Sequence, residues 1–247
     1  MIPLFKTHYS IGKSILNVES ETKEGGADSV IELAKKHKIE KVVFVEDQMH
    51  GFLKTKSEVE KNNLDFVFGL RLPVSDNYEQ KETHKIVIFA KNDEGIKKLY
   101  KIYSEANCGH EGRITLEDLS KHWNGDDLLL FIPFYDSYIH RNNFSFDSFV
   151  PNFNGLGKVS FFIESNLLPI DVFLREKVES VAKASNASVV FAKSIYYKKR
   201  EDLKAYQTFR IISLRKGGKA TNISRPELEE CGSSEFCIES WAEKCEI

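Results

Sequence analysis

The chain has 247 residues, a formal net charge of −2, 41% hydrophobic residues and 29% charged residues. This length suits one α/β barrel, and the composition is ordinary for a globular protein. The near-neutral charge excludes polyanion binding over the whole surface, so a nucleic-acid contact would need a local basic patch. We therefore expect one domain over residues 1–247.

Cysteine usage and hydropathy bear on where the protein works. The four cysteines are Cys108, Cys231, Cys237 and Cys245, and no two of them form a Cys-x-x-Cys pair. This pattern is typical of reduced thiols in a cytosolic protein. The N-terminal segment has no signal-peptide pattern, and no apolar run approaches the ~20 residues of a membrane span. We expect a cytoplasmic protein without membrane contacts.

Short β-branched and aromatic runs alternate with helical patterns along the chain. The expected strands are 3–9, 41–46, 65–70, 85–90, 128–132, 158–163 and 188–192. Several are continuous apolar runs, which is typical of strands buried on both faces of a parallel sheet. Helices are expected to begin near Ser29, Asp93, Thr115, Pro169, Arg200 and Ser233 or Ser234. Seven strands that each lead into a helix favour an α/β barrel.

In such a barrel, chemistry gathers at the carboxyl ends of the strands. The polar or unusual residues expected at those ends are His8, Asp47, His50, Arg71, 133–136 and 194–197. Nucleotide-binding glycine loops and common hydrolase motifs are absent from the sequence. Taken alone, His8 is more often a structural histidine than a metal ligand, and an acid such as Asp47 more often caps a helix.

The order and spacing of these pieces resemble the polymerase and histidinol phosphatase (PHP) domain family, in the form found at the N-terminus of the bacterial DNA polymerase III alpha subunit. The matching segments are LFKTHYS (4–10), VFVEDQMHG (43–51), Gly69-Leu70-Arg71, HKIVIFAKNDEGIKKLYKI (84–102), IPF (132–134), 193–197 and the tail 224–245. The resemblance implies a distorted (β/α)7 barrel. It also implies phosphoester hydrolysis by metal ions that His, Asp, Glu and Cys side chains hold.

Carried over residue by residue, the family's metal-site positions are mostly replaced. They correspond to Lys6, His8, Asp47, Gln48, Arg71, His84, Ser194 and Tyr196, with Pro133 or Phe134 at the position of a cysteine. Only His8, Asp47 and His84 keep a metal-binding side chain, and His50 is a possible substitute ligand. Lys6 and Arg71 cannot donate a lone pair at pH 7, which argues against a trinuclear site. We predict that Lys6 or Arg71 instead pairs with Asp47.

Three functions stay open at this point. The first is a stand-alone, catalytically inactive PHP-domain protein without a cofactor, of phage or mobile-element origin, that acts in DNA replication or repair. Its partners would be a polymerase, an exonuclease or another replisome component. Candidate contacts are the aromatic residues after the fifth strand: Phe134, Tyr135, Tyr138, Phe144, Phe146 and Phe149.

The second function is a phosphoesterase or 3′–5′ exonuclease that binds zinc or manganese in a rearranged site. The third is DNA binding through a cationic cleft. In that cleft Lys6, Arg71 and Lys193 would contact phosphates, and Tyr196 and Tyr197 would stack on bases.

Overall fold

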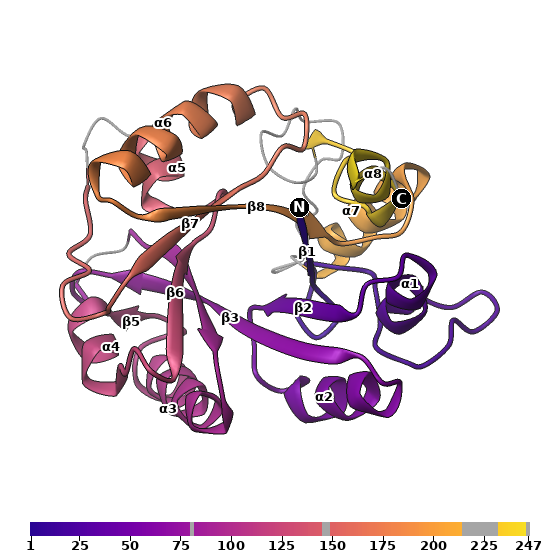
Figure 1. Ribbon diagram of the computed structural model, residues 1–247, viewed down its shortest axis with the longest axis horizontal. Helices are drawn as coiled ribbons and strands as arrows, with labels where there is room; N and C mark the ends of the chain where they lie inside the picture. Colours follow the sequence, from indigo (N-terminus) through magenta and orange to yellow (C-terminus); the bar gives the residue numbers. More distant parts are fainter. Residues whose placement is uncertain (80–81, 145–148, 214–231, 246–247) are drawn as a thin grey trace.

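In the computed structural model, which describes residues 1–79, 82–144, 149–213 and 232–245, seven strands close into a barrel with helices outside it (Figure 1). The barrel strands are β1 (Ile2–Phe5), β2 (Lys41–Glu46), β3 (Asp65–Ser75), β4 (His84–Ala90), β6 (Leu128–Ile132), β7 (Val159–Ile163) and β8 (Ser188–Ile195). They follow the order β2-β1-β8-β7-β6-β4-β3, and pairing of β3 with β2 closes the ring. A two-residue strand, β5 (Ile114–Thr115), is added beside β3.

The expected α/β barrel is confirmed, but the (β/α)7 arrangement of its elements and the fully parallel sheet are not. Strand β4 runs antiparallel to both β3 and β6. The physical reason lies in the connection 76–83, which is too short for the crossover of a dozen or more residues that a parallel neighbour requires. Strand β3 also extends to Ser75, beyond the expected end at residue 70, so β3 and β4 form a hairpin.

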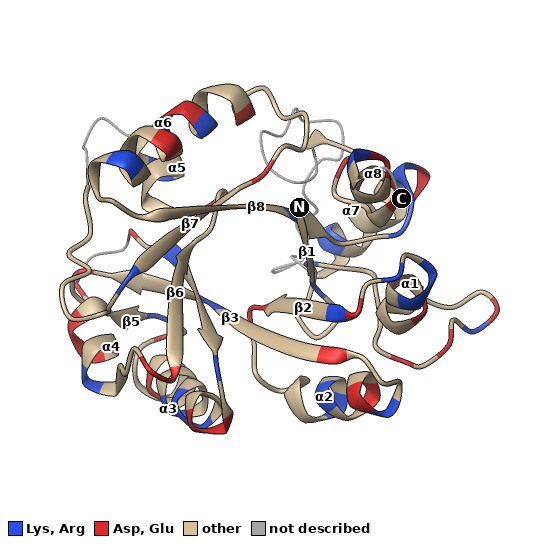
Figure 2. Cartoon of the chain, viewed as in Figure 1, with Lys and Arg blue, Asp and Glu red and all other residues tan. Residues whose placement is uncertain are grey.

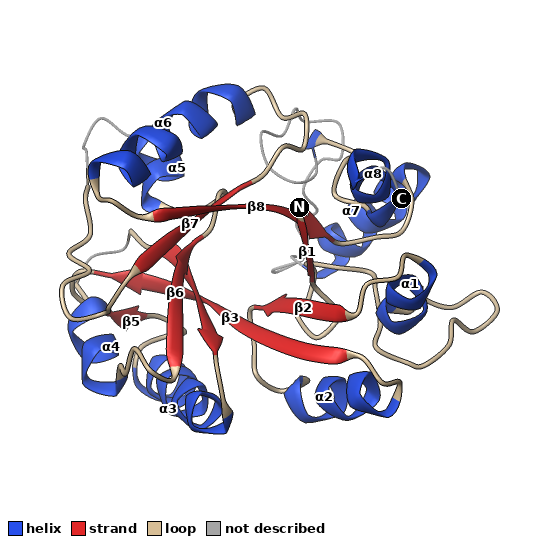
Figure 3. Cartoon of the chain, in the orientation of Figure 1, coloured by secondary structure: helices blue, strands red, loops and turns tan. Residues whose placement is uncertain are grey.

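Helices cover the outside of the ring, as Figure 3 shows. They are α1 (Val30–Lys36), α2 (Phe52–Lys61), α3 (Asp93–Gly109), α4 (Leu116–His122), α5 (Tyr138–Asn142), α6 (Asp171–Ala184), a 3-10 turn (Arg200–Asp202), α7 (Leu203–Ser213) and α8 (Ile238–Cys245). Charged residues gather mainly on these helices and on the loops, and the strands are largely uncharged (Figure 2). In the described part of the chain, no helix combines the length and the apolar character needed to cross a membrane.

The expected helix starts are mostly confirmed, because their caps are local. Ser29 and Thr115 each accept a hydrogen bond from the third residue after them and thereby cap α1 and α4. The last helix is an exception, because α8 begins at Ile238 and not at Ser233 or Ser234. Ser233 instead donates to the carbonyl of Asn166, in the loop after β7.

The apolar core has two layers, set by the alternation of side chains along each strand. The inner layer fills the barrel with Leu4, Val43, Val45, Val87, Phe89, Phe162 and Ala192. Neighbouring residues on the same strands, such as Phe5, Phe44 and Ile86, face outward and pack in the larger layer that includes the helices. The inner layer stops short of the carboxyl ends of the parallel strands, where polar side chains replace it.

Candidate functional site

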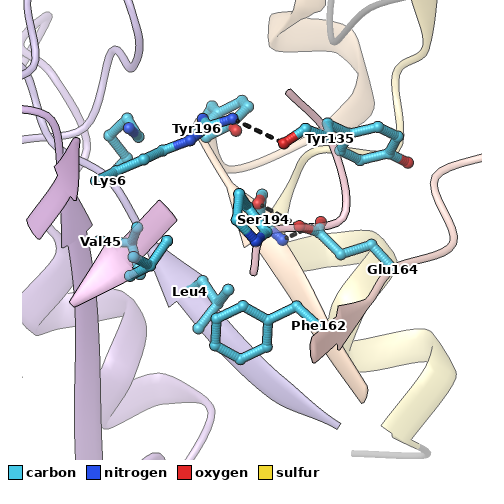
Figure 4. A pocket seen from close by; sticks show the side chains of 11 residues that line it. Leu4, Lys6, Val45, Tyr135, Phe162, Glu164, Ser194 and Tyr196 are labelled. Carbon is cyan, nitrogen blue, oxygen red and sulfur yellow. Dashed lines mark hydrogen bonds between the residues drawn. The ribbon is translucent and has the colours of Figure 1, made fainter. Parts of the chain in front are cut away.

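A pocket opens at the carboxyl ends of the parallel strands, which we call the barrel mouth (Figure 4). Inner-layer residues form its floor: Leu4, Val45, Val87 and Phe162. Its walls and rim are Lys6, Arg71, Pro133, Tyr135, Glu164, Ser194 and Tyr196. Five of the sequence-predicted site positions therefore do meet in one pocket: Lys6, Arg71, Pro133, Ser194 and Tyr196.

Lys6 and Asp47 form a buried ion pair at this mouth. They follow the parallel neighbours β1 and β2, and Lys6 Nζ lies 2.8 Å from Asp47 Oδ1. The two side chains are 3% and 18% exposed. Burial alone would raise the pKa of Asp47, but the positive charges of Lys6, Lys85 and Arg71 hold it well below its usual range. The predicted pairing of Asp47 is confirmed, with Lys6 as its partner.

Arg71 pairs with a different carboxylate. Its Nη2 donates to Asp136 Oδ2 at 2.8 Å and to the carbonyl of Tyr135 at 3.2 Å. Asp136 has a φ of 60°, in the left-handed region that Asp tolerates better than most residues. This turn aims the carboxylate at Arg71, while the Asp136 carbonyl accepts the backbone N–H of Lys85 at 2.8 Å. The loop after β6 is thereby tied to both β3 and β4.

Lys85 is a third cation near Lys6 and Arg71, outside the residues that line the pocket, and it was not predicted as a site residue from the sequence. It shares the inward face of β4 with Val87 and Phe89, and it pairs in register with Pro73. Burial and the nearby charge of Arg71 lower the pKa of Lys85 to about 8. Its charge also acts on Asp47 and Asp136. Asp47 and Asp136 therefore each lie within the field of more than one of these cations.

A second carboxylate lies behind Lys6. Glu46 is 3% exposed and accepts hydrogen bonds from the backbone N–H and hydroxyl of Thr7, at 2.9 and 2.7 Å, and from the hydroxyl of Ser10. Burial raises the pKa of Glu46 to about 7, although Lys6 opposes the rise. Ser10 Oγ also accepts the backbone N–H of Asp47 at 2.8 Å. The loops after β1 and β2 are locked together by these bonds.

Glu164 is a further site residue that sequence reasoning missed. It follows β7 and accepts from the N–H and the hydroxyl of Ser194 at 2.8 and 2.9 Å (Figure 4). Asn166 Nδ2 donates to Glu164 at 3.0 Å and to the hydroxyl of Tyr135 at 3.2 Å, and that hydroxyl donates to Asp171 at 2.8 Å. Glu164 directly follows an apolar strand, and this position was the signal that could have identified it from the sequence.

The expected metal ligands His8, Asp47 and His84 are not brought together. The His84 side chain lies on the outward face of β4, beside Tyr138 and Phe149, with ring-centroid distances of 6.1 and 5.3 Å. Burial lowers its pKa to about 4. His84 was therefore assigned to the wrong face, because one step along a strand reverses the direction of the side chain.

The other two histidines of the prediction lie on the surface. The rings of His8 and His50 flank Tyr9, with centroids 4.3 and 5.2 Å from the tyrosine ring. Gln48, at another former metal position, is half-buried. Asp47 alone of the proposed ligands faces the mouth, where its closest charged partner is an ammonium group.

The predicted cationic cleft differs from the structure in three residues. Lys193 is fully buried and points outward from β8, where Nζ donates to Asn166 Oδ1 at 2.7 Å. Tyr196 lines the pocket, but its ring is stacked against those of Tyr206 and Phe236. Tyr197 is fully buried. These three side chains are not displayed for phosphates or bases, because Asn166 holds Lys193 and the two tyrosines pack in a separate apolar cluster with Tyr206 and Phe236.

The loop aromatics are also more buried than expected. Phe134 and Tyr138 are 0% and 5% exposed, and Tyr135 and Phe149 are half-buried against the core. Phe144 is 56% exposed. Phe146, like Cys231, lies outside the described residues. Phe134 and Tyr138 belong to the outer core layer, and Tyr138 is the first residue of the short helix α5.

Comparison with known families agrees with this geometry. The PHP domain family matches residues 6–147, more than half of the chain, and the protein therefore belongs to this family. Strands β7 and β8 lie beyond the matched segment but complete the same barrel. No curated protein matches the chain.

The donor set at the mouth does not fit the metal ions that the family resemblance implies. In the described residues, no group of three or more His, Cys, Asp or Glu side chains is placed to hold a metal ion. The ammonium group of Lys6 forms an ion pair with Asp47 at 2.8 Å, and the guanidinium group of Arg71 forms one with Asp136. Cationic side chains repel a divalent ion and offer it no lone pair.

Proposed function

We propose that this protein is a catalytically inactive PHP-domain protein in which ion pairs take the place of metal ions. The proposal extends to a role in DNA replication or repair through protein contacts, as the resemblance to the N-terminal domain of the polymerase III alpha subunit implies. A polymerase, an exonuclease or another replisome component is the expected class of partner.

The proposed loss of catalysis rests on one observation, the Lys6–Asp47 ion pair in the barrel mouth. A metal ion at Asp47 would have to displace a buried ammonium that is 3% exposed and leave it without its partner. Breaking a buried ion pair costs about 3–5 kcal/mol. The binding of the metal ion to a single carboxylate would have to offset this cost. The arrangement favours a closed, metal-free mouth over a hydrolytic centre.

The role in protein contacts rests on the family resemblance and on the surface near α5. Phe144, directly after α5, is 56% exposed, and Val150 nearby in sequence is 73% exposed. Exposed apolar side chains on one loop are candidates for a partner interface. They replace the wider set of loop aromatics as the residues to test.

Metal content and hydrolysis test the loss of catalysis. The purified protein should hold well under one equivalent of zinc or manganese after dialysis. It should melt at the same temperature with and without chelator, and it should not hydrolyse phosphodiesters when either metal is added. Stoichiometric metal together with a metal-dependent activity that His8→Ala abolishes would establish the phosphoesterase alternative instead.

The partner is tested separately by affinity capture from a bacterial replication extract. We expect mass spectrometry to identify a polymerase or exonuclease subunit with the wild type, and we expect Phe144→Ser to reduce its recovery. Leu53→Ser, at a 72% exposed residue of α2, is the matched control. Equal recovery by both variants, or no replication protein at all, would contradict the proposed role.

A further inference from the structure

The loop that leads from β7 into α6 holds a leucine in a strained backbone conformation. Leu167 has a φ of 57°, in the left-handed region, where a bulky L-residue is an outlier and where Gly and Asn are the residues usually found. The Leu167 side chain is nevertheless 72% exposed. Burial of this side chain within its own chain is therefore small and does not compensate for the strain.

Buried polar contacts hold the loop in this conformation. Asp171 Oδ2 accepts the backbone N–H groups of both Asn166 and Leu168, at 2.7 and 3.2 Å. The hydroxyl of Ser233 donates to the carbonyl of Asn166. Leu167 is thereby fixed between two anchored neighbours, directly before the N-terminal end of α6. Strain that the surrounding structure fixes in this way is typical of functional sites.

Further exposed apolar side chains lie on the elements next to this loop. Val172 and Phe173, in the first turn of α6, are 72% and 52% exposed. Phe191 of β8 is also exposed, and it pairs in register with Ile163, the last residue of β7, so it lies near the start of the same loop. We call Leu167, Val172, Phe173 and Phe191 the α6 patch. Exposed apolar side chains that gather in this way mark interaction sites.

The charges beside the α6 patch are of both signs. Arg175 and Lys177 lie over the two phenylalanine rings of the patch, 5.4 and 5.2 Å from the ring centroids, and Arg175 also pairs with Glu179. Glu176 is exposed between them. Residues 172–179 thus carry two cations and two carboxylates, and Figure 2 shows both colours along α6. A strongly acidic or basic partner would meet as many like charges as opposite charges at this face.

We propose that the α6 patch is the contact surface of a symmetric dimer, with a second copy of this chain as its partner. In a twofold contact the same face meets itself, so an apolar face with balanced charges around it is self-complementary. Burial of Leu167 against the second copy would supply the stabilisation that the single chain lacks. This inference goes beyond the proposed function and needs no replication partner.

The size of the α6 patch predicts a weak dimer. Stable interfaces bury about 800 Å² on each partner, which four partly exposed side chains do not reach alone. Association should therefore depend on protein concentration. Sedimentation velocity of the full chain is measured from about 1 to about 300 μM. We expect the average mass of the wild type to rise over this range from that of one chain toward that of two.

Leu167→Asn is the most informative variant, because it should stabilise the single chain and weaken the dimer. Asn adopts the left-handed region readily, so the equilibrium constant for urea unfolding of dilute protein should fall about fivefold. The dissociation constant of the dimer should rise at least about tenfold, because a central apolar side chain is lost. Leu53→Asn is the matched control at an equally exposed leucine of α2, and it should leave the dissociation constant unchanged.

Glu176→Lys tests the identity of the partner. Each copy of the face would then carry a net positive charge, so two copies should repel each other and the dissociation constant should rise at least about threefold. The proposal is overturned if the wild type stays monomeric over the whole concentration range, or if either Leu167→Asn or Glu176→Lys dimerises like the wild type. A dilute Leu167→Asn protein that is less stable than the wild type would also overturn it, because Leu167 would then stabilise its own chain.

Discussion

Lys6 Nζ and Asp47 Oδ1 lie 2.8 Å apart, and their residues directly follow the parallel neighbours β1 and β2. Removing either partner leaves the other charge buried, so Lys6→Met and Asp47→Leu should each destabilise the protein by about 3 kcal/mol. The paired apolar variant Lys6→Met with Asp47→Leu should cost far less than the two single changes together. Urea unfolding of the four proteins measures this coupling, and additive costs would contradict an energetically coupled pair.

The position of Asp47 could be predicted from the sequence, because the end of its strand was visible there. Lys6 lay inside the expected strand 3–9, which in the structure ends at Phe5. Continuous apolar runs defined β2 and β6 to the residue. Once two strands are parallel neighbours, the residues after them meet at one end of the sheet. The family resemblance supplied the neighbours, so Lys6 and Asp47 could be placed together without coordinates.

The face of each side chain could not be predicted in the same way. In β4, Ile86, Val87, Ile88 and Phe89 are all apolar, so no alternation of polar residues reveals which face points inward. A shift of one residue exchanges His84 for Lys85 on the inward face of β4. The same ambiguity in β8 placed Lys193 in the pocket, where Ser194 actually lies.

Glu46 should give the protein a distinctive pH dependence. Burial raises its pKa in the folded state to about 7, from an ordinary value of 4.5. Between these values the folded state keeps a proton that the unfolded chain has lost, so the contribution of Glu46 to stability falls as the pH rises from 4.5 to 7. The loss is at most about 3 kcal/mol.

The Glu46→Gln variant should lack this fall in stability as the pH rises from 4.5 to 7. His84, whose pKa is lowered to about 4, contributes with the opposite sign in part of the same window, so only the difference between wild type and variant isolates Glu46. The free energy of unfolding is measured from pH 4.5 to 7.5 for both proteins. A constant difference across this range would show that Glu46 titrates normally.

Lys85→Met should stabilise the protein at pH 7. The pKa of Lys85 is lowered to about 8, so the folded state holds its proton more weakly than the unfolded chain, and charged Lys85 destabilises the fold. We expect a gain of about 1–2 kcal/mol, less than the full shift implies because the side chain is only partly buried. The gain should shrink as the pH rises from 8 toward 10.5, because wild-type stability rises there.

The same measurement with Lys101→Met supplies the control, since that lysine is exposed on α3. Its free energy of unfolding should stay within about 0.5 kcal/mol of the wild type. A Lys85→Met variant less stable than the wild type at pH 7 would mean that Lys85 has a stabilising partner in the protein.

Asp136 should be sensitive to backbone conformation as well as to charge. Its φ of 60° costs an ordinary L-residue about 1–2 kcal/mol, whereas Asn adopts this region nearly as readily as Asp. Asp136→Asn removes the ion pair with Arg71 and should cost about 1 kcal/mol, because the Asp136 carboxylate is 36% exposed. Asp136→Ala should cost about 1 kcal/mol more, since it adds the backbone penalty.

Urea unfolding of the two variants separates these effects. Asp136→Gly is the useful third variant, because glycine accepts a positive φ but carries no carboxylate. Its stability should lie closer to that of Asp136→Asn than to that of Asp136→Ala. Equal stability of Asp136→Ala and Asp136→Asn would show that the turn relaxes at no cost. In that case the loop after β6 would not be held rigidly in place for Arg71 and Lys85.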